Sequence, residues 1–437
     1  MRKVKFALVV VMLLALAIPL VASAQAVTYT SGFQLQNLSS TQANVQMTYY
    51  TQAGTPTSVS DTIPANGSKT YYPLTAVPSG FTGSMVVSSD QPVAAIVNVL
   101  GNNGQRADSY SSFSQGASPM SLPLVERNNY NINTWFNVQN TGSTAANVTV
   151  AYKPGTCTET ASIPAFSSKT FDQSTNACLP SGFVGAATVT GSQPVAVTVM
   201  QVTPQSLLAY TGFGSASTNP IMPLVSSGYY KSGTGIQIQN TGASDTSVTI
   251  SYAPSAGFPG SPCTETRTVP ASASVTFAYP TFPAGCGASF VGSGHVTGNT
   301  ASMPLVAIVN QVTQGKANAS SYDAINSANA TSKVSLPLIM DRNYNYFTGF
   351  SIANVGTQST NVACTFSGTS FTIASTPVAP GASLTAVQLN QIAPGYVGSA
   401  TCTATGGDAK IAGIVNELLS TAPASTDGLF TYSAFNF

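Results

Sequence analysis

Apolar and polar residues alternate along most of the chain. The alternation is clearest in three stretches where every second residue is apolar: Val45, Met47 and Tyr49; Val148, Val150 and Tyr152; Val248, Ile250 and Tyr252. An apolar residue at every second position indicates a β-strand with one buried face. Beyond the first 24 residues, no window shows a convincing helical apolar period. The hydrophobic pattern therefore predicts an all-β protein.

The pattern occurs four times. Each copy begins with a similar stretch ("FQLQNLSS", "FNVQNTGS", "IQIQNTGA", "FSIANVGT"), continues through "GFTGS", "GFVGA", "SFVGS" or "GYVGS", and closes on Tyr110, Tyr210, Tyr322 or Tyr432. Similarity at a fixed period is the signature of a repeat protein. We predict four tandem repeats of about 105 residues, at 25–120, 121–220, 221–334 and 335–437.

Each repeat contains enough short strands for a two-layer fold. Six to eight predicted strands per repeat, separated by Gly, Pro and Asn turns, favour an antiparallel β-sandwich of immunoglobulin-like (Ig-like) type. The "V/I-Q-N-T-G" turn that leads into a "V-T-V/I-x-Y" strand resembles the start of the Ig-like modules of bacterial cell-adhesion and envelope proteins. The resemblance covers about 20 residues per repeat. It implies a sandwich fold and an extracellular, mostly non-enzymatic setting, and it transfers no catalytic residues.

The first residues predict export from the cell. Arg2, Lys3 and Lys5 precede an apolar run from Phe6 to Val21, and Ala22-Ser23-Ala24 fits a signal-peptidase site. A membrane-spanning helix is the rival interpretation, but this run is short for a bilayer core. We predict a signal peptide at residues 1–24, with cleavage after Ala26 as the second choice. The mature protein is then secreted, extracellular or at the cell surface, with no membrane span.

Charge excludes some partners. The signal holds three of the 14 Lys and Arg residues, which leaves 11 basic residues against 13 acidic ones. Such a surface does not attract nucleic acid or acidic membranes. Charged residues make up only 6% of the chain, but 43% of it is apolar, which is enough to bury a core.

The six cysteines predict three disulfides. Cys157 and Cys178 in the second repeat and Cys263 and Cys286 in the third have similar local surroundings and spacing, and secretion provides an oxidising compartment. In the fourth repeat, Cys364 and Cys402 occupy positions where the third has Ile250 and Val296, so both should face the core. We predict the pairs Cys157–Cys178, Cys263–Cys286 and Cys364–Cys402. A metal site would need clustered Cys or His ligands, and we expect none.

Catalytic motifs are lacking, so we predict that the protein is not an enzyme and uses no cofactor. His295 is the only histidine, and packing or surface exposure explains it better than catalysis. Trp135 stands where the other repeats have Gly32, Gly235 and Gly349. Exposed aromatic residues can form a platform for sugars, but we favour core packing for most of them. Five sequons make Asn37, Asn66, Asn147, Asn318 and Asn329 candidate glycosylation sites, and O-linked sugar is an equal alternative.

One segment occurs only three times: "SLPLVERNNYN" at 121–131, "IMPLVSSGYYK" at 221–231 and "SLPLIMDRNYN" at 335–345. Its apolar pattern suits a strand, which its proline should confine to a sheet edge. One end of the protein should therefore lack a strand. We predict a secreted structural protein that assembles with itself into a filament or surface layer, with "QAVTYT" (25–30) as the strand donated to the next subunit. The alternative is a secreted adhesin or glycan-binding protein, with glycans or other envelope proteins as partners.

Overall fold

The computed structural model describes residues 28–102, 104–278, 281–300 and 302–437. The predicted signal peptide, residues 1–24, lies outside this part of the chain. The described residues form 33 strands and three short 3-10 turns, η1 (Tyr229–Lys231), η2 (Ala284–Cys286) and η3 (Ser327–Asn329). The strands build eight antiparallel sheets, two for each repeat. The all-β fold of repeated sandwiches predicted from the alternation is confirmed.

Repeat 2 shows the complete unit. One sheet has the order β11-β10-β13-β8 and the other β12-β9-β14-β15. The strands are β8 (Met120–Arg127), β9 (Asn133–Asn140), β10 (Ala146–Lys153), β11 (Thr158–Ile163), β12 (Ser168–Asp172), β13 (Phe183–Gly191), β14 (Val195–Val202) and β15 (Leu207–Thr211). The strand that carries the L-P-L sequence, β8, pairs with β13 and so belongs to the repeat that follows it in the chain.

Repeats 3 and 4 have the same plan with one short strand added. The sheets are β19-β18-β21-β16-β24 with β20-β17-β22-β23, and β28-β27-β30-β25-β33 with β29-β26-β31-β32. The strands of repeat 3 are β16 (Pro220–Ser227), β17 (Ser232–Asn240), β18 (Thr246–Pro254), β19 (Cys263–Val269), β20 (Ser274–Phe277), β21 (Phe290–Gly298), β22 (Leu305–Thr313), β23 (Ala319–Asp323) and β24 (Ile325–Asn326). Those of repeat 4 are β25 (Lys333–Asp341), β26 (Tyr346–Asn354), β27 (Thr360–Phe366), β28 (Thr372–Val378), β29 (Ser383–Val387), β30 (Tyr396–Thr405), β31 (Ile411–Leu419), β32 (Leu429–Ser433) and β33 (Phe435–Asn436).

Within the part of the chain that the structure describes, repeat 1 has one strand fewer than repeat 2. Its sheets are β3-β2-β5 and β4-β1-β6-β7. The strands are β1 (Tyr29–Asn37), β2 (Ala43–Thr51), β3 (Pro56–Ile63), β4 (Ser68–Tyr71), β5 (Gly83–Ser89), β6 (Val93–Gly101) and β7 (Arg106–Ser111). Among the described residues β5 pairs only with β2, whereas its counterpart β13 pairs with both β10 and β8.

A buried asparagine fixes the turn at the start of each repeat. The Asn140 amide donates hydrogen bonds to the carbonyl oxygens of Thr144 (2.7 Å), Ile163 (3.1 Å) and Pro164 (3.0 Å). Its oxygen accepts the backbone N–H of Gly142 (2.9 Å). The side chain therefore ties the turn to the end of a neighbouring strand, which explains why an asparagine recurs here. Equivalent bonds are made by Asn37, Asn240 and Asn354.

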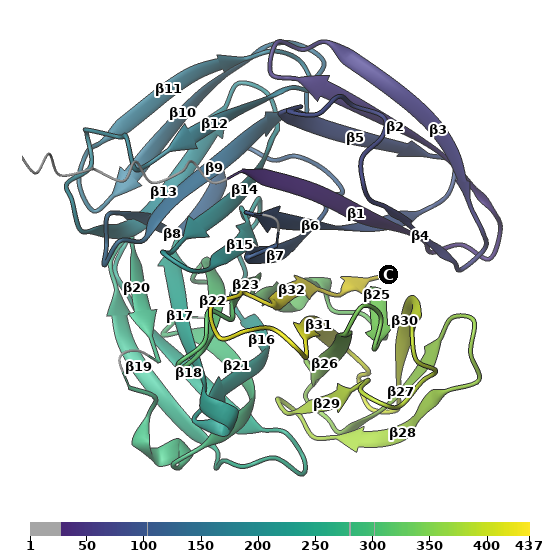
Figure 1. Ribbon diagram of the computed structural model, residues 1–437. Helices are drawn as coiled ribbons and strands as arrows, with labels where there is room; N and C mark the ends of the chain where they lie inside the picture. Colours follow the sequence, from purple (N-terminus) through teal and green to yellow (C-terminus); the bar gives the residue numbers. More distant parts are fainter. Residues whose placement is uncertain (1–27, 103, 279–280, 301) are drawn as a thin grey trace, which may run out of the picture.

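The four repeats are arranged in a ring, as Figure 1 shows by the sequence of colours around the molecule. The strands that carry the closing tyrosines, β7, β15, β23 and β32, meet at its centre. There β7 contacts β15 and β32, and β23 contacts the same two strands. The first and last repeats therefore touch, and each repeat has a neighbour on both sides.

Candidate functional site

The three L-P-L strands share an irregularity at their proline. In β8 the pairing with β13 shifts register opposite Pro123 and Leu124, and the same shift occurs in β16 and β25. Proline has no N–H to donate, so a bulge is a natural place for it. The predicted edge position is correct for β8 but wrong for β16 and β25, which have β24 and β33 outside them. Those short strands pair only with residues on the N-terminal side of the bulge, which in repeat 3 are Pro220 and Ile221.

The closing tyrosine of each complete repeat holds the L-P-L strand of the same repeat. The Tyr210 hydroxyl donates to the carbonyl oxygen of Leu124 (2.5 Å) and accepts the backbone N–H of Leu124 (3.3 Å). Tyr432 makes the same two bonds with Leu338 (2.5 and 3.1 Å). In repeat 3 the partners are Tyr322 and Leu224. Backbone groups freed by the bulge are thus satisfied by a buried hydroxyl.

Repeat 1 has the tyrosine without its partner. Tyr110 occupies the corresponding position on β7, and its hydroxyl makes no hydrogen bond with any described residue. Burial raises the pKa of Tyr110 to about 12. The prediction that one end of the protein lacks a strand is therefore confirmed for repeat 1, within the described part of the chain.

The absent strand leaves apolar side chains partly exposed. Val93 and Val97 on β6 are half-buried. Their counterparts in the other repeats are fully buried: Val195 and Val199, Leu305 and Val309, and Ile411 and Val415. Met85 on β5 is also half-buried and stands where the complete repeats have Ala187, Gly294 and Ala400. We call this feature the vacant slot: the free edge of β5 together with Met85, Val93, Val97 and Tyr110.

Repeat 2 is the neighbouring repeat that faces the vacant slot. In the other repeats the L-P-L strand also packs on the next repeat of the ring: β8 on β17 and β22, β16 on β26 and β31, and β25 on β1 and β6. Through these contacts the core of the repeat that supplies the L-P-L strand also takes up an isoleucine of the next repeat. These isoleucines are Ile308, Ile414 and Ile96. Thr198 is the corresponding residue of repeat 2, and it is half-buried. A polar residue therefore stands at the one position where the described residues supply no L-P-L strand.

Polar pairs join three of the four junctions of the ring. The amides of Gln201 and Asn310 bond reciprocally between repeats 2 and 3 (3.2 and 2.8 Å), and Asn98 donates to Glu417 between repeats 1 and 4 (3.2 Å). Between repeats 3 and 4 the pair is Gln311 with Asn416.

The junction of repeats 1 and 2 combines apolar and aromatic contacts with two hydrogen bonds, from Arg106 to the Pro204 carbonyl oxygen (2.6 Å) and from the Ser84 hydroxyl to the Phe166 carbonyl oxygen (2.7 Å). Val99 and Met200 lie in one buried cluster, and Tyr29 contacts Trp135 edge to face at 5.5 Å. Tyr50 packs on Phe166 at 5.4 Å. Phe166 has a left-handed backbone (φ 60°) where the other repeats have Asn66, Ser272 and Gly381. Trp135 and Phe166 thus pack across the junction at which no L-P-L strand is found in the described ranges, which gives Trp135 a packing role.

One carboxylate links the four central strands. Asp108 accepts the backbone N–H groups of Ser109 (2.8 Å), Ala209 (2.5 Å), Ser321 (3.0 Å) and Thr431 (3.1 Å), and the Ser320 hydroxyl. These donors come from β7, β15, β23 and β32. Other buried acids lie at the junctions around it. Burial raises the pKa of Asp323 to about 7, and that of Glu417 and Asp427 to about 8.

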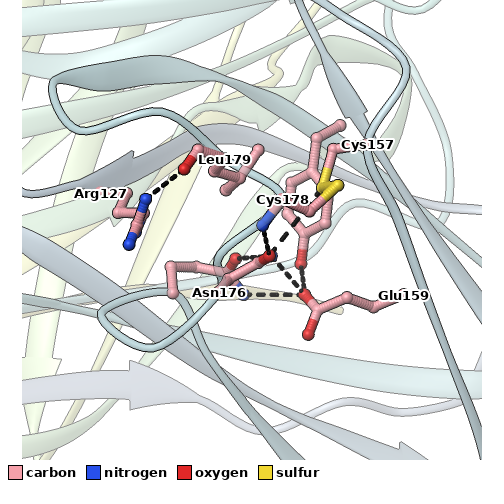
Figure 2. Close-up of a disulfide and its surroundings, with 8 residues drawn as sticks. Arg127, Cys157, Glu159, Asn176, Cys178 and Leu179 are labelled. Carbon is pink, nitrogen blue, oxygen red and sulfur yellow. Dashed lines mark hydrogen bonds between the residues drawn. A yellow bond between two sulfur atoms is a disulfide. The ribbon is translucent and has the colours of Figure 1, made fainter.

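The three predicted disulfides are present: Cys157–Cys178, Cys263–Cys286 and Cys364–Cys402. Cys364 and Cys402 face each other across β27 and β30 and are fully buried, as predicted. Figure 2 shows the first bond on a loop held by Asn176, whose amide donates to Glu159 (2.8 Å) and whose oxygen accepts the Cys178 N–H (3.0 Å).

The candidate glycosylation sites differ in exposure. Asn37 is fully buried, and its amide makes the turn hydrogen bonds described above, so a glycan on Asn37 is incompatible with this fold. Asn66, Asn147 and Asn329 are exposed, and Asn318 is half-buried. Glycosylation of these four remains a prediction.

Other candidate chemistry is sparse. The Nε2 atom of His295 lies 3.1 Å from the Gly381 carbonyl oxygen, and burial lowers the pKa of this imidazole. Within the described ranges, no three His, Cys, Asp or Glu residues are grouped so that they could hold a metal ion. No helix among the described residues is long and apolar enough to cross a membrane.

The predicted strand donor is not free. Tyr29 and Thr30 of the "QAVTYT" segment belong to β1 and pair with Gly101 and Leu100 of the same repeat. Donation of this segment to another subunit would remove the start of β1 from its own sheet. This part of the sequence-based hypothesis is therefore wrong, because β1 extends further toward the N-terminus than the sequence pattern indicated.

No family model matches the chain, and no curated protein matches it. Among solved structures, a tetra-tandem repeat in the extending region of a large adhesion protein is 14% identical to it, over 94% of this chain and 99% of that one, with a TM-score of 0.12. A similarity at this level carries no argument about fold or function.

Proposed function

We propose that the protein is a secreted structural subunit that joins an extracellular filament or surface layer by accepting a β-strand in its first repeat. The observation that carries the proposal is the vacant slot, where a strand edge and a tyrosine hydroxyl have no partner among the described residues and lie beside half-buried valines. Edges of this kind recruit strands from other chains. The three disulfides support an oxidising, extracellular location.

The donor strand must come from outside the described residues. All three described L-P-L strands pair within their own repeats, and the last residues of the chain form β33 on β25. Because residues 1–24 are predicted to be removed with the signal peptide, a neighbouring polypeptide is the proposed donor. The ring gives the acceptor rigidity, because the edge of β5 is held by packing of repeat 1 against both of its neighbours.

A self-complemented variant tests the function. Residues 120–132, which contain β8 and its turn, are inserted between Ala26 and Val27, so that the slot is filled from within the same chain. The protein is expressed in its source organism, and surface material is viewed by negative-stain electron microscopy. We expect native protein in filaments or layers and the variant as single rings in the medium.

The matched control carries the same insertion with two of its apolar residues changed, Leu122→Asp and Val125→Asp in the inserted copy. It cannot fill the slot, so assembly should return. Assembly of the self-complemented variant at the native level, or native protein found only as single rings, would reject the proposed function.

A further inference from the structure

We propose that the vacant slot binds an extended segment of another polypeptide with the sequence apolar-Pro-Leu-(Val/Ile), antiparallel to β5, with its leucine backbone hydrogen-bonded to Tyr110. This inference deepens the proposed function, because it names the chemistry of the donor strand. Such a strand is already seated at three sites in the same chain.

The filled sites define the sequence that fits. The residue before the proline is Leu122, Met222 or Leu336, and each is fully buried in the sandwich core. The residue after the Pro-Leu pair is Val125, Val225 or Ile339, and each of these is fully buried too. The sandwich thus binds a strand that has two apolar side chains separated by a bulged Pro-Leu pair. In repeat 1 the corresponding space is bordered by Val93 and Val97, which a seated strand would bury.

The direction and register follow from the same comparison. Each L-P-L strand runs antiparallel to the strand equivalent to β5, and Val125 lies opposite Gly185. Gly83 of β5 is the counterpart of Gly185. A glycine is needed there because a Cβ at Gly83 would lie 2.0 Å from the Tyr50 carbonyl oxygen, and one at Gly185 would lie 2.0 Å from that of Lys153. The backbone of β5 therefore approaches β2 as closely as that of β13 approaches β10.

Tyr110 provides the polar anchor. In each complete repeat the equivalent hydroxyl donates to the carbonyl oxygen of the leucine after the proline. This leucine lies in the register shift and has no partner residue on the neighbouring strand, so its backbone groups are available to the tyrosine. A donor strand in the slot would give Tyr110 the hydrogen bond that it lacks among the described residues.

Met85 sets the affinity. Its counterpart Gly294 contacts the buried apolar residue of the L-P-L strand so closely that an added Cβ would lie 2.6 Å from the Met222 side chain. A methionine at this position takes part of the space that the incoming apolar side chain needs. Methionine is unbranched and flexible, so it can move aside at some cost. We infer reversible binding, which becomes tighter when residue 85 is small.

The test uses a synthetic peptide of residues 120–128, MSLPLVERN, added to the oxidised chain that begins at Gln25. Titration calorimetry gives the affinity, and fluorescence of Trp135, the only tryptophan of the chain, reports on the junction beside the slot. We expect saturable binding, and none by a peptide with aspartate at the positions of Leu122 and Val125. Met85→Ala should tighten binding severalfold, because it makes the slot resemble that of repeat 2.

Two tyrosine variants separate binding from stability. Tyr110→Phe should weaken the peptide about tenfold, the usual effect of one lost hydrogen bond, and leave the melting temperature of the free protein unchanged. Tyr210→Phe should lower the melting temperature and leave the peptide affinity unchanged, since its hydroxyl is already used within repeat 2. Binding that responds equally to both variants would overturn the inference.

Three other outcomes are decisive. No binding at peptide concentrations up to about 1 mM overturns the inference. The second outcome compares the chain that begins at Gln25 with the chain that begins at Met1. Residues 18–21, Ile-Pro-Leu-Val, have the same pattern as the L-P-L strands. If only the chain from Gln25 binds the peptide, residues 18–21 are the occupant of the slot, and the inference is overturned. Specific binding of the peptide by a protein that never forms filaments or layers supports the inference and rejects only the proposed function.

Discussion

Asp108 accepts a hydrogen bond from the backbone N–H of Thr431 (3.1 Å), which joins the first repeat to the last. The two residues lie more than 300 positions apart in the sequence. The same carboxylate accepts the N–H groups of Ala209 and Ser321 from the two other repeats. A single buried side chain thus couples all four repeats, and the ring should behave as one cooperative unit.

Replacement of Asp108 by asparagine tests this coupling. The amide of the variant would present an NH2 group to backbone N–H donors on one side, so at least one buried donor would lose its acceptor. We expect Asp108→Asn to lower the free energy of unfolding by about 3 kcal/mol. Chemical denaturation measured by circular dichroism gives the value. Asp245→Asn is the matched control, because Asp245 is exposed and accepts only the N–H of Ala271. A loss no larger than that of the control would contradict the coupling role.

Glu417 makes the junction between the first and last repeats sensitive to pH. Burial raises the pKa of Glu417 to about 8, and its Oε1 atom has no partner among the described residues. The fold therefore favours the protonated, uncharged form of Glu417. The equivalent positions of repeats 2 and 3 hold Gln201 and Gln311, which are also uncharged. The pKa of Glu417 is thus higher in the folded protein than in the unfolded chain. Its contribution to the free energy of unfolding is therefore complete below the ordinary pKa near 4.5 and is lost as pH rises through about 8.

The prediction compares Glu417→Gln with the native chain. At pH 4 the two should unfold at similar denaturant concentrations. At pH 9 the variant should be more stable by on the order of 3 kcal/mol, because it has no charge to bury. The Glu417 charge contributes to the raised pKa of Tyr346 and Tyr432, but both phenols remain protonated at pH 9 with or without it. Asp427 is present in both chains, so the difference isolates Glu417. A stability difference that does not depend on pH would show that Glu417 is not protonated in the fold.

Much of each sandwich could be predicted from the sequence. The alternation of Val148, Val150 and Tyr152 predicts a strand with one buried face, and all three side chains are buried. Two disulfide pairs could be predicted from equivalent spacing in neighbouring repeats, and Cys364–Cys402 from the core positions that these two residues occupy. These features depend on local periodicity or on comparison of repeats, and both can be read from one chain.

The ring and the vacant slot could not be predicted to the same extent. Asp108 shows no distinctive pattern, because its donors are backbone groups far away in the sequence. The three L-P-L segments and four closing tyrosines could be counted, but the sequence could not decide which neighbour each L-P-L strand completes. Antiparallel pairing with the preceding or the following repeat would bury the same apolar residues. The pairing of β8 with β13 and the contact of Tyr210 with Leu124 show that the strand belongs to the repeat that follows.

Reduction should open the disulfides in an order set by exposure. Cys178 is exposed, Cys263 is half-buried with Cys286 buried, and Cys364 and Cys402 are both fully buried. Thiol exchange requires access of the attacking thiolate to a sulfur atom. We expect a mild reductant under native conditions to cleave Cys157–Cys178 first and Cys364–Cys402 last. Timed alkylation followed by peptide mass spectrometry measures the order. First cleavage of Cys364–Cys402 would mean that repeat 4 opens locally more often than its burial indicates.

Proteolysis between repeats should nick the chain without taking the ring apart. The sequence predicts cleavage near residues 115–120, 215–220 and 326–333, and exposed residues such as Gln115 and Ser215 lie at the first two. Four independent domains would then separate as fragments of roughly 100 residues. In the ring, however, the fragments remain joined by the central strands and by the pairs Gln201–Asn310 and Asn98–Glu417. We expect size-exclusion chromatography of the nicked protein to give the native elution volume in buffer and separate fragments only in denaturant. Separation in buffer would show that the repeats do not form a stable ring.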